Sequence, residues 1–201
     1  FSDKACMIDA IYKKNKQLSK NLKANIINEY FNIKINNNFL INKASINSKD
    51  VKKNNIFFGI KGKNIDGNKF ADVALKKKAS ICILEKNYSK KNSRKIFVKD
   101  TLKTFSNLSC VIRKSLGTPI VAITGSAGKT SLKELIGQSL NILTPTLYSK
   151  KSFNNQYGVP LSLFNLDKKH KIGVFEIGMD KKGEIHKLSN LIRPDIGVIT
   201  N

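Results

Sequence analysis

The sequence has few residues of the kinds that hold metal ions or form disulfides. Its three cysteines, Cys6, Cys82 and Cys110, lie far apart and form no C-x-x-C pair, and its two histidines are His170 and His186. This spacing argues against a zinc site or a disulfide framework and favours a reducing cytoplasm. Two histidines also leave little material for a histidine-based metal site or catalytic triad.

The chain also lacks a long apolar run. No stretch approaches the ~20 residues of a membrane-spanning helix, and the N-terminus shows no signal-peptide pattern. We therefore expect a cytoplasmic protein without a membrane span. The 201 residues suffice for one large domain or two small ones, and a hydrophobic content of 40% favours a packed core. Because the chain starts at Phe1 and stops within the apolar run 196–201, we interpret it as a piece of a longer protein.

Acidic residues are scarce relative to basic ones. The chain has 14 Asp and Glu against 37 Lys and Arg, for a net charge of +23. Such a charge is typical of proteins with nucleic-acid or other acidic partners. Here the lysines are spread along the chain, together with abundant Asn and Ile, and do not alternate with aromatic residues as in a strand-binding platform. We therefore favour a general composition bias and predict no nucleic-acid partner, while nucleotides and diphosphates remain compatible with the charge.

Apolar periodicity predicts strands that alternate with helices. The expected helices are 3–14, 18–31, 69–78, 101–116, 129–141, 155–164 and 183–191. The expected strands are 39–46, 56–60, 80–84, 96–98, 120–123, 146–148, 172–177 and 196–200. This order favours an α/β fold with parallel sheets, divided into two domains near 115–118.

The strongest chemical signal is a glycine-rich segment, Val-Ala-Ile-Thr-Gly-Ser-Ala-Gly-Lys-Thr-Ser at 121–131, between a predicted strand and a predicted helix. Backbone N–H groups of such a turn can surround phosphate oxygens, and the helix N-terminus adds a favourable dipole. Lys129 would contact the β- and γ-phosphates of ATP, and the Thr130 hydroxyl would bind Mg²⁺. An incidental turn is the alternative, since Ile123 stands where the common phosphate-loop pattern has its first glycine. The predicted nucleotide-binding residues are Gly125, Ser126, Ala127, Gly128, Lys129, Thr130 and Ser131.

Four sequence blocks together resemble the Mur ligase family over about residues 20–201. The first, at 46–62, is similar to the block that holds the UDP-sugar, which implies substrate contacts for Ser48 and Lys49. Asn47 and Lys49 stand where the family has Asp and Arg; lysine keeps the positive charge for a diphosphate but loses the bidentate fork of arginine. The second block is the phosphate loop, in the shorter form Thr-Gly-Ser-x-Gly-Lys-Thr that Mur ligases carry.

The third block resembles one branch of the family, and the fourth resembles a metal-binding strand end of the family. Asn-Asn-Gln-Tyr-Gly-Val-Pro at 154–160 resembles the branch that adds D-alanyl-D-alanine, and implies that Asn154 and Asn155 contact phosphate or substrate; a helix cap is the alternative. The fourth block resembles a strand end whose glutamate binds Mg²⁺, and Glu176 is the match. A carboxylate at the carboxyl end of a parallel strand lies where such folds bind ligands. The resemblance thus gives Lys129 and Glu176 catalytic roles.

The resemblance also implies a division of the chain. Residues 18–116 would form the UDP-sugar-binding domain, and 117–201 would begin the central ATP-binding domain. Residues 1–17 resemble the final helix of a preceding Mur ligase, with an atypical N-terminal extension as the alternative. The family's carbamylated lysine and adenine contacts would lie beyond Asn201, so we expect this piece alone to be inactive.

The implied activity is that of an ATP- and Mg²⁺-dependent carboxylate–amine ligase of peptidoglycan synthesis, and hence of cell wall biogenesis, cell shape and division. ATP would activate the terminal carboxylate of UDP-N-acetylmuramoyl tripeptide as an acyl phosphate, which the amine of D-alanyl-D-alanine would attack. We expect a cytoplasmic monomer. The alternatives are the diaminopimelate- or lysine-adding Mur ligase, a folylpolyglutamate or cyanophycin type of ligase, a basic P-loop ATPase acting on nucleic acid, and a nucleotide-binding fold that has lost catalysis.

Overall fold

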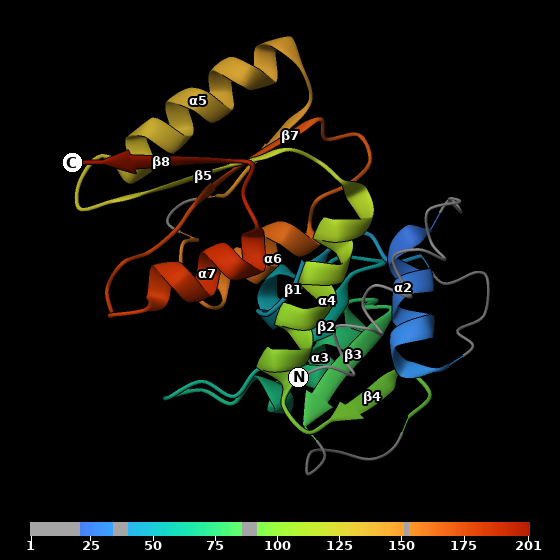
Figure 1. Ribbon diagram of the computed structural model, residues 1–201. Coiled ribbons are helices and arrows are strands. Elements are labelled where there is room, and N and C mark those ends of the chain that lie inside the picture. Colours follow the sequence, from blue (N-terminus) through green and yellow to red (C-terminus); the bar gives the residue numbers. More distant parts are fainter. Residues whose placement is uncertain (1–20, 34–39, 86–91, 151–152) are drawn as a thin grey trace. The chain divides into compact units, whose positions relative to one another are not determined.

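The computed structural model describes residues 21–33, 40–85, 92–150 and 153–201 (Figure 1). The chain divides into two compact units, 1–111 and 112–201. The described part of each unit contains a four-stranded sheet in which all neighbouring strands are parallel. The predicted parallel α/β architecture is therefore confirmed. The helix expected over 3–14 lies outside the described residues.

The first unit has the strand order β1-β2-β3-β4. Its strands are β1 Ala44–Ser45, β2 Ile56–Phe58, β3 Ile81–Glu85 and β4 Lys95–Val98. Its helical elements are α2 Leu22–Phe31, η1 Ser48–Asp50, η2 Gly67–Phe70, α3 Ala71–Lys76 and the first part of α4 Thr101–Leu116. Phe57 packs among residues of α3, whereas the ring of its neighbour Phe58 lies 4.3 Å from that of Phe105 in α4. Because successive strand residues face opposite sides, helices cover both faces of the sheet, and the central strands are apolar except for Glu85 at the end of β3.

The second unit has the strand order β6-β7-β5-β8. Its strands are β5 Ile120–Gly125, β6 Thr146–Tyr148, β7 Ile172–Glu176 and β8 Ile196–Thr200, and its further helices are α5 Lys129–Leu143, α6 Gly158–Phe164 and α7 Glu184–Ile192. Figure 1 shows α5 on one side of this sheet and α6 and α7 on the other. Ile120 and Phe175 of the sheet are buried against Val159 and Leu163 of α6 and Leu188 of α7. The carboxyl ends of β5 and β7 therefore meet at one edge of a buried sheet.

The bounds of most elements agree with the predictions, but the first strand is much shorter than expected. The prediction placed a strand over 39–46, whereas only Ala44 and Ser45 pair with β2. The Asn47 side chain accepts a hydrogen bond from the Lys49 N–H and begins a 3-10 turn. The chain therefore leaves the sheet directly after Ser45.

Asparagine side chains lie at the described starts of two predicted helices. The helix expected from 18 begins at Leu22 in the described residues, with the Asn21 side chain as its cap. The helix expected from 155 begins at Gly158, because the Asn155 Oδ1 atom accepts from the N–H groups of Tyr157 and Gly158, both at 3.0 Å. Asparagine competes with helical backbone bonds and is favoured at helix starts.

None of the helices that the structure describes has both the length and the apolar character needed to cross a bilayer.

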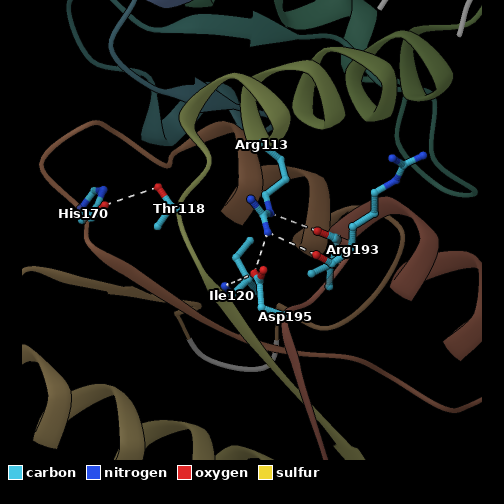
Figure 2. A network of polar contacts seen from close by, with 7 residues as sticks. Arg113, Thr118, Ile120, His170, Arg193 and Asp195 are labelled. Atoms are coloured by element: carbon cyan, nitrogen blue, oxygen red, sulfur yellow. Dashed lines mark hydrogen bonds and ion pairs between the residues drawn. The ribbon is translucent and has the colours of Figure 1, made fainter. Parts of the chain in front are cut away.

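A buried arginine ties together several backbone ends in the second unit (Figure 2). Arg113 of α4 donates from Nη2 to Asp195 Oδ2 at 2.9 Å, and that same oxygen accepts from the Ile120 N–H at 2.8 Å. Arg113 also donates to the carbonyls of Ile192 and Arg193 at the end of α7, each at 3.2 Å. The last carbonyls of a helix lack partners within it, so Arg113 closes α7 and fixes the starts of β5 and β8.

We expect Arg113→Met to destabilise this unit by about 2 kcal/mol, because it leaves buried carbonyls without a donor while half of Asp195 remains solvated. Urea unfolding followed by circular dichroism measures the loss. Lys103→Met, on an exposed position of the same helix, is the matched control and should stay within about 0.5 kcal/mol of the parent chain. Equal losses in the two variants would contradict a role for the network.

Burial also controls the chemistry of Cys82 in β3. Desolvation raises the pKa of its thiol from 9.0 to about 12, against the opposing charges of Lys95 and Arg94. The thiol is fully buried and its Sγ lies 3.6 Å from the Ala71 carbonyl. Since thiolates are the reactive form, this cysteine should be inert in the folded chain.

A variant that keeps only Cys82, with Cys6→Ser and Cys110→Ser, tests this directly. We expect it to react with a maleimide at least about 100-fold more slowly in buffer near pH 8 than in concentrated urea. A variant that keeps only the partly exposed Cys110 is the comparison and should show a smaller ratio. Rapid labelling of folded Cys82 would show that the first unit opens easily.

Candidate functional site

The glycine-rich segment forms the turn from the carboxyl end of β5 into α5. Gly125 and Gly128 have φ of +138° and +75°, values that strongly favour glycine. Ser126, Ala127, Gly128 and Ser131 are exposed at the start of α5. The first N–H groups of a helix have no partners within it and carry a partial positive charge. An exposed loop of this shape is suited to bind an anion such as phosphate.

The Lys129 side chain lies back over this loop. Its Nζ atom donates to the carbonyl oxygen of Gly125 at 2.5 Å and to that of Ser126 at 3.2 Å. The ammonium charge is therefore held next to the backbone groups that would surround a phosphate. An anion at this position would compete with the two carbonyls for the ammonium.

Glu176 connects two other predicted site residues. It ends β7 with 1% of its surface exposed. Its Oε2 accepts from the Thr130 hydroxyl at 2.8 Å, and its Oε1 accepts from the Asn154 amide at 2.8 Å. A buried carboxylate is costly unless it is hydrogen-bonded, and here each oxygen has a donor. Three sequence blocks that are separate in the chain thus converge on one carboxylate.

Backbone contacts fix this arrangement. Ile123 pairs with Glu176 in the β5–β7 register. The next residue, Ile177, donates its N–H to the Ile123 carbonyl at 2.8 Å and accepts from the Thr124 hydroxyl at 3.1 Å. The Asn154 carbonyl accepts from the Gly178 N–H at 2.6 Å. The carboxylate and both of its donors are therefore positioned by the sheet and by the loop before α6.

Asn155 has a different role in the structure from its neighbour. Its side chain is exposed and caps α6, whereas the hydrogen bonds of the Glu176 carboxylate go to Thr130 and Asn154. The helix-cap alternative therefore describes what its Oδ1 atom does. Its predicted contact with substrate stays a prediction.

The remaining predicted contacts, Ser48 and Lys49, lie in the first unit. Ser48 is buried, whereas Lys49 is exposed. The Lys49 carbonyl accepts from the Lys77 ammonium at 2.7 Å, which brings a second lysine to this turn. Sequence reasoning missed Lys77, because a run of three lysines is typical of a solvated surface and gives no sign of a specific contact. The predicted contacts of Ser48 and Lys49 with the UDP-sugar stay a prediction.

The donors at Glu176 fit a hard cation. The described residues contain no group of three or more His, Cys, Asp or Glu side chains that could hold a metal ion by itself. One carboxylate and one hydroxyl, from Glu176 and Thr130, are oxygen donors of the kind that Mg²⁺ accepts when phosphate and water complete its shell. Such a site would form together with a phosphate-bearing ligand.

Comparisons with known proteins identify proteins that are similar to this chain. Residues 123–201 match the model of the Mur ligase middle domain. The UDP-N-acetylmuramoyl-tripeptide--D-alanyl-D-alanine ligase of Buchnera aphidicola subsp. Acyrthosiphon pisum is 37% identical over 162 residues, which are 81% of this chain and 35% of that protein.

The fold of this chain is also similar to solved structures of MurF. MurF from Acinetobacter baumannii has a TM-score of 0.69 and 29% identity, covering 79% of this chain and 35% of that one. The MurF ligase of Thermotoga maritima, solved in complex with ADP, has a TM-score of 0.67 and 31% identity, covering 82% of this chain and 38% of that one.

The chain is similar to the Mur ligase family, and its residues 123–201 match the middle domain of that family. Within that family, its relatives carry the name UDP-N-acetylmuramoyl-tripeptide--D-alanyl-D-alanine ligase, and its structural neighbours carry the name MurF. The chain spans about a third of the length of these relatives, 35% for the one from Buchnera.

Because Asn154 and Asn155 have different partners, replacing each with aspartate should have different effects on stability. Asn154→Asp would put a second carboxylate against the buried one of Glu176, which should cost about 2 kcal/mol or more of stability near pH 7. Asn155→Asp should cost less than about 0.5 kcal/mol, because aspartate caps helices as well as asparagine does.

Urea unfolding of both variants at pH 7 measures these losses. A small loss for Asn154→Asp at neutral pH would show that its amide does not hold Glu176 in solution.

Proposed function

We propose that this chain is part of an ATP-dependent ligase that joins D-alanyl-D-alanine to UDP-N-acetylmuramoyl tripeptide in the synthesis of peptidoglycan precursors. The observation that carries the proposal is the convergence of Thr130 and Asn154 on the buried Glu176, beside a phosphate-binding loop. The names of the relatives support the choice of substrates. We place the enzyme in the cytoplasm, where these nucleotide-linked precursors form, and infer that it acts as a monomer.

The proposed reaction proceeds in two steps. A carboxylate oxygen of the tripeptide attacks the γ-phosphorus of ATP, the bond to the β-phosphate oxygen breaks, and ADP leaves. The amine of D-alanyl-D-alanine then attacks the carbonyl carbon of the acyl phosphate, loses a proton, and expels phosphate. Because ATP and the carboxylate are both anionic, the site must neutralise charge to bring them together.

The residues of the second unit supply that neutralisation. Lys129 exchanges the carbonyls of Gly125 and Ser126 for the β- and γ-phosphates of ATP, which requires only rotation of its side chain. The loop residues from Gly125 to Ser131 surround the phosphates with N–H groups. Mg²⁺, held by Thr130 and Glu176, would neutralise charge on the phosphate oxygens when bound.

Asn154 acts on Glu176 rather than on the phosphates in this proposal. Its amide holds Oε1, so that Oε2 faces Thr130 at 2.8 Å. A carboxylate oriented in advance loses little freedom when it binds a cation. Asn155 remains a proposed contact to phosphate or substrate through the part of its amide that does not cap α6.

The first unit would bind the nucleotide-sugar end of the substrate. We propose that Ser48 and Lys49 contact the diphosphate region, and that Lys77, whose ammonium is on the Lys49 carbonyl, adds positive charge there. In this proposal residues 18–116 form the UDP-sugar-binding domain and 117–201 begin the central ATP-binding domain. The tail of a preceding ligase remains our interpretation of residues 1–17.

Phosphate release tests the proposal in the protein encoded by the complete open reading frame. We expect release from ATP to require Mg²⁺, UDP-N-acetylmuramoyl tripeptide and D-alanyl-D-alanine together, and to stop with EDTA. Lys129→Ala should lower kcat by about 100-fold or more, because it removes a cation from the transferring phosphoryl group. Lys169→Ala, on an exposed loop of the same unit, is the control and should leave the rate unchanged.

Other outcomes select other functions. Release with UDP-N-acetylmuramoyl dipeptide and diaminopimelate would assign the chain to the neighbouring branch of the family. Release that depends on single-stranded DNA and falls steeply with salt would favour the nucleic-acid ATPase. Because the 201-residue chain spans about a third of the length of its relatives, we expect it to form no peptide bond by itself, and measurable ligation by it would contradict this expectation.

A further inference from the structure

We propose that Thr200, at the carboxyl end of β8, is a positioning residue that fixes the phosphate-binding loop from the side opposite β7. The proposal rests on the proposed function, because it assumes that a nucleotide binds at this loop. Neither the phosphate-loop pattern nor the magnesium-binding strand end includes Thr200, and its position on another strand hides the contact from a motif search.

The hydroxyl of Thr200 bridges two points of the loop. Its Oγ1 lies 3.2 Å from the Thr124 carbonyl oxygen and 2.5 Å from the Ala127 carbonyl oxygen. A threonine hydroxyl has a single proton to donate, so the two carbonyls share it. These carbonyls flank the stretch 125–126 in which the chain leaves the sheet. The hydroxyl therefore fixes the beginning of the loop relative to its middle.

A second contact from the same strand end holds the loop at the same residue. The Ala127 N–H donates to the Asn201 carbonyl at 2.6 Å. The peptide groups on both sides of Ala127 are therefore bonded to the chain at 200–201. Rotation of either peptide group would break one of these bonds, so the orientation of this part of the loop depends on the end of β8.

The approach of the two segments requires glycine at position 125. Gly125 pairs with Thr200 in the β5–β8 register. A Cβ atom on Gly125 would lie 2.2 Å from Thr200 Oγ1 and 2.3 Å from the Thr200 carbonyl oxygen. Glycine is therefore needed here for the contact with Thr200 as well as for its φ of +138°.

The loop is thus held on both flanks. On the β7 side, the Thr124 hydroxyl donates to the Ile177 carbonyl, and Thr130 is bonded to Glu176. On the β8 side, Thr200 provides the corresponding contact. A loop whose N–H groups are oriented in advance binds phosphate without the entropy cost of ordering it. Loss of the Thr200 hydroxyl should therefore weaken nucleotide binding more than it weakens the fold.

The test uses the protein encoded by the complete open reading frame, with Mg²⁺ and ADP as the probe in isothermal titration calorimetry. We expect Thr200→Val, which keeps the shape and removes the hydroxyl, to raise the Kd for ADP by about fivefold to tenfold. Thr200→Ser keeps the hydroxyl and should stay within about twofold of the parent. In the ligase assay, Thr200→Val should raise the KM for ATP and leave the KM for D-alanyl-D-alanine unchanged.

Thr118→Val is the matched control for a purely structural effect. Thr118 precedes β5 at the other end of the sheet, and its hydroxyl lies 3.4 Å from the His170 carbonyl (Figure 2). This change removes one hydroxyl contact of the same unit, so it should lower the thermal midpoint and leave the Kd for ADP within about twofold.

Three results would overturn the inference in distinguishable ways. An unchanged Kd in Thr200→Val, with the parent binding ADP, would show that the hydroxyl does not position the loop. Equal weakening by Thr200→Ser and Thr200→Val would show that the methyl group or the packing, and not the hydroxyl, is responsible. Absence of ADP binding by the parent protein would remove the proposed function itself, and this inference with it.

Discussion

The second unit is organised around one buried carboxylate. Thr130 donates to one oxygen of the buried Glu176 carboxylate and Asn154 donates to the other, and each donor comes from a different segment of the chain. These hydrogen bonds constrain both partners. The buried carboxylate requires donors from the start of α5 and from the segment before α6, and the same bonds hold those two segments close to each other. The hydrogen bonds of the Glu176 carboxylate therefore link the position of β7 beside β5 to the conformation of the phosphate loop.

Much of this could be predicted from the sequence, because the signals are local. Apolar runs interrupted by polar turns indicated the parallel sheets, and Lys129, Thr130 and Glu176 were predicted as site residues from short motifs. Contacts between distant segments gave no such signal. The side chains of Thr200 and Lys77 act on backbone carbonyls, and any residue type has such a carbonyl, so no pairing pattern marks them. The length of β1 was overestimated for a related reason, since only Ala44 and Ser45 pair with β2 and the Asn47 side chain then begins a turn.

The asparagines show where composition misleads. The chain is rich in asparagine, which made a helix cap a reasonable interpretation of both Asn154 and Asn155. The structure separates the two neighbours: one amide donates to a buried carboxylate, and the other side chain accepts from the backbone at the start of α6. Although the two residues are adjacent, the Asn154 side chain bonds to Glu176 of β7 and the Asn155 side chain bonds to the start of α6. Only the fold distinguishes these two uses of one residue type.

The two strands under the phosphate loop are anchored at both ends. Asp195, just before β8, accepts from the N–H of Ile120 at the start of β5, while Thr200, at the far end of β8, bonds the loop that follows β5. The number of residues between Asp195 and Thr200 is therefore fixed. The bonds at the two ends of β8 can form together only when β8 matches the length of β5. Substitutions along this stretch can be accommodated, but a one-residue insertion or deletion would move Thr200 to the wrong face of the sheet. Variation in this part of the chain is thus restricted in length more than in composition.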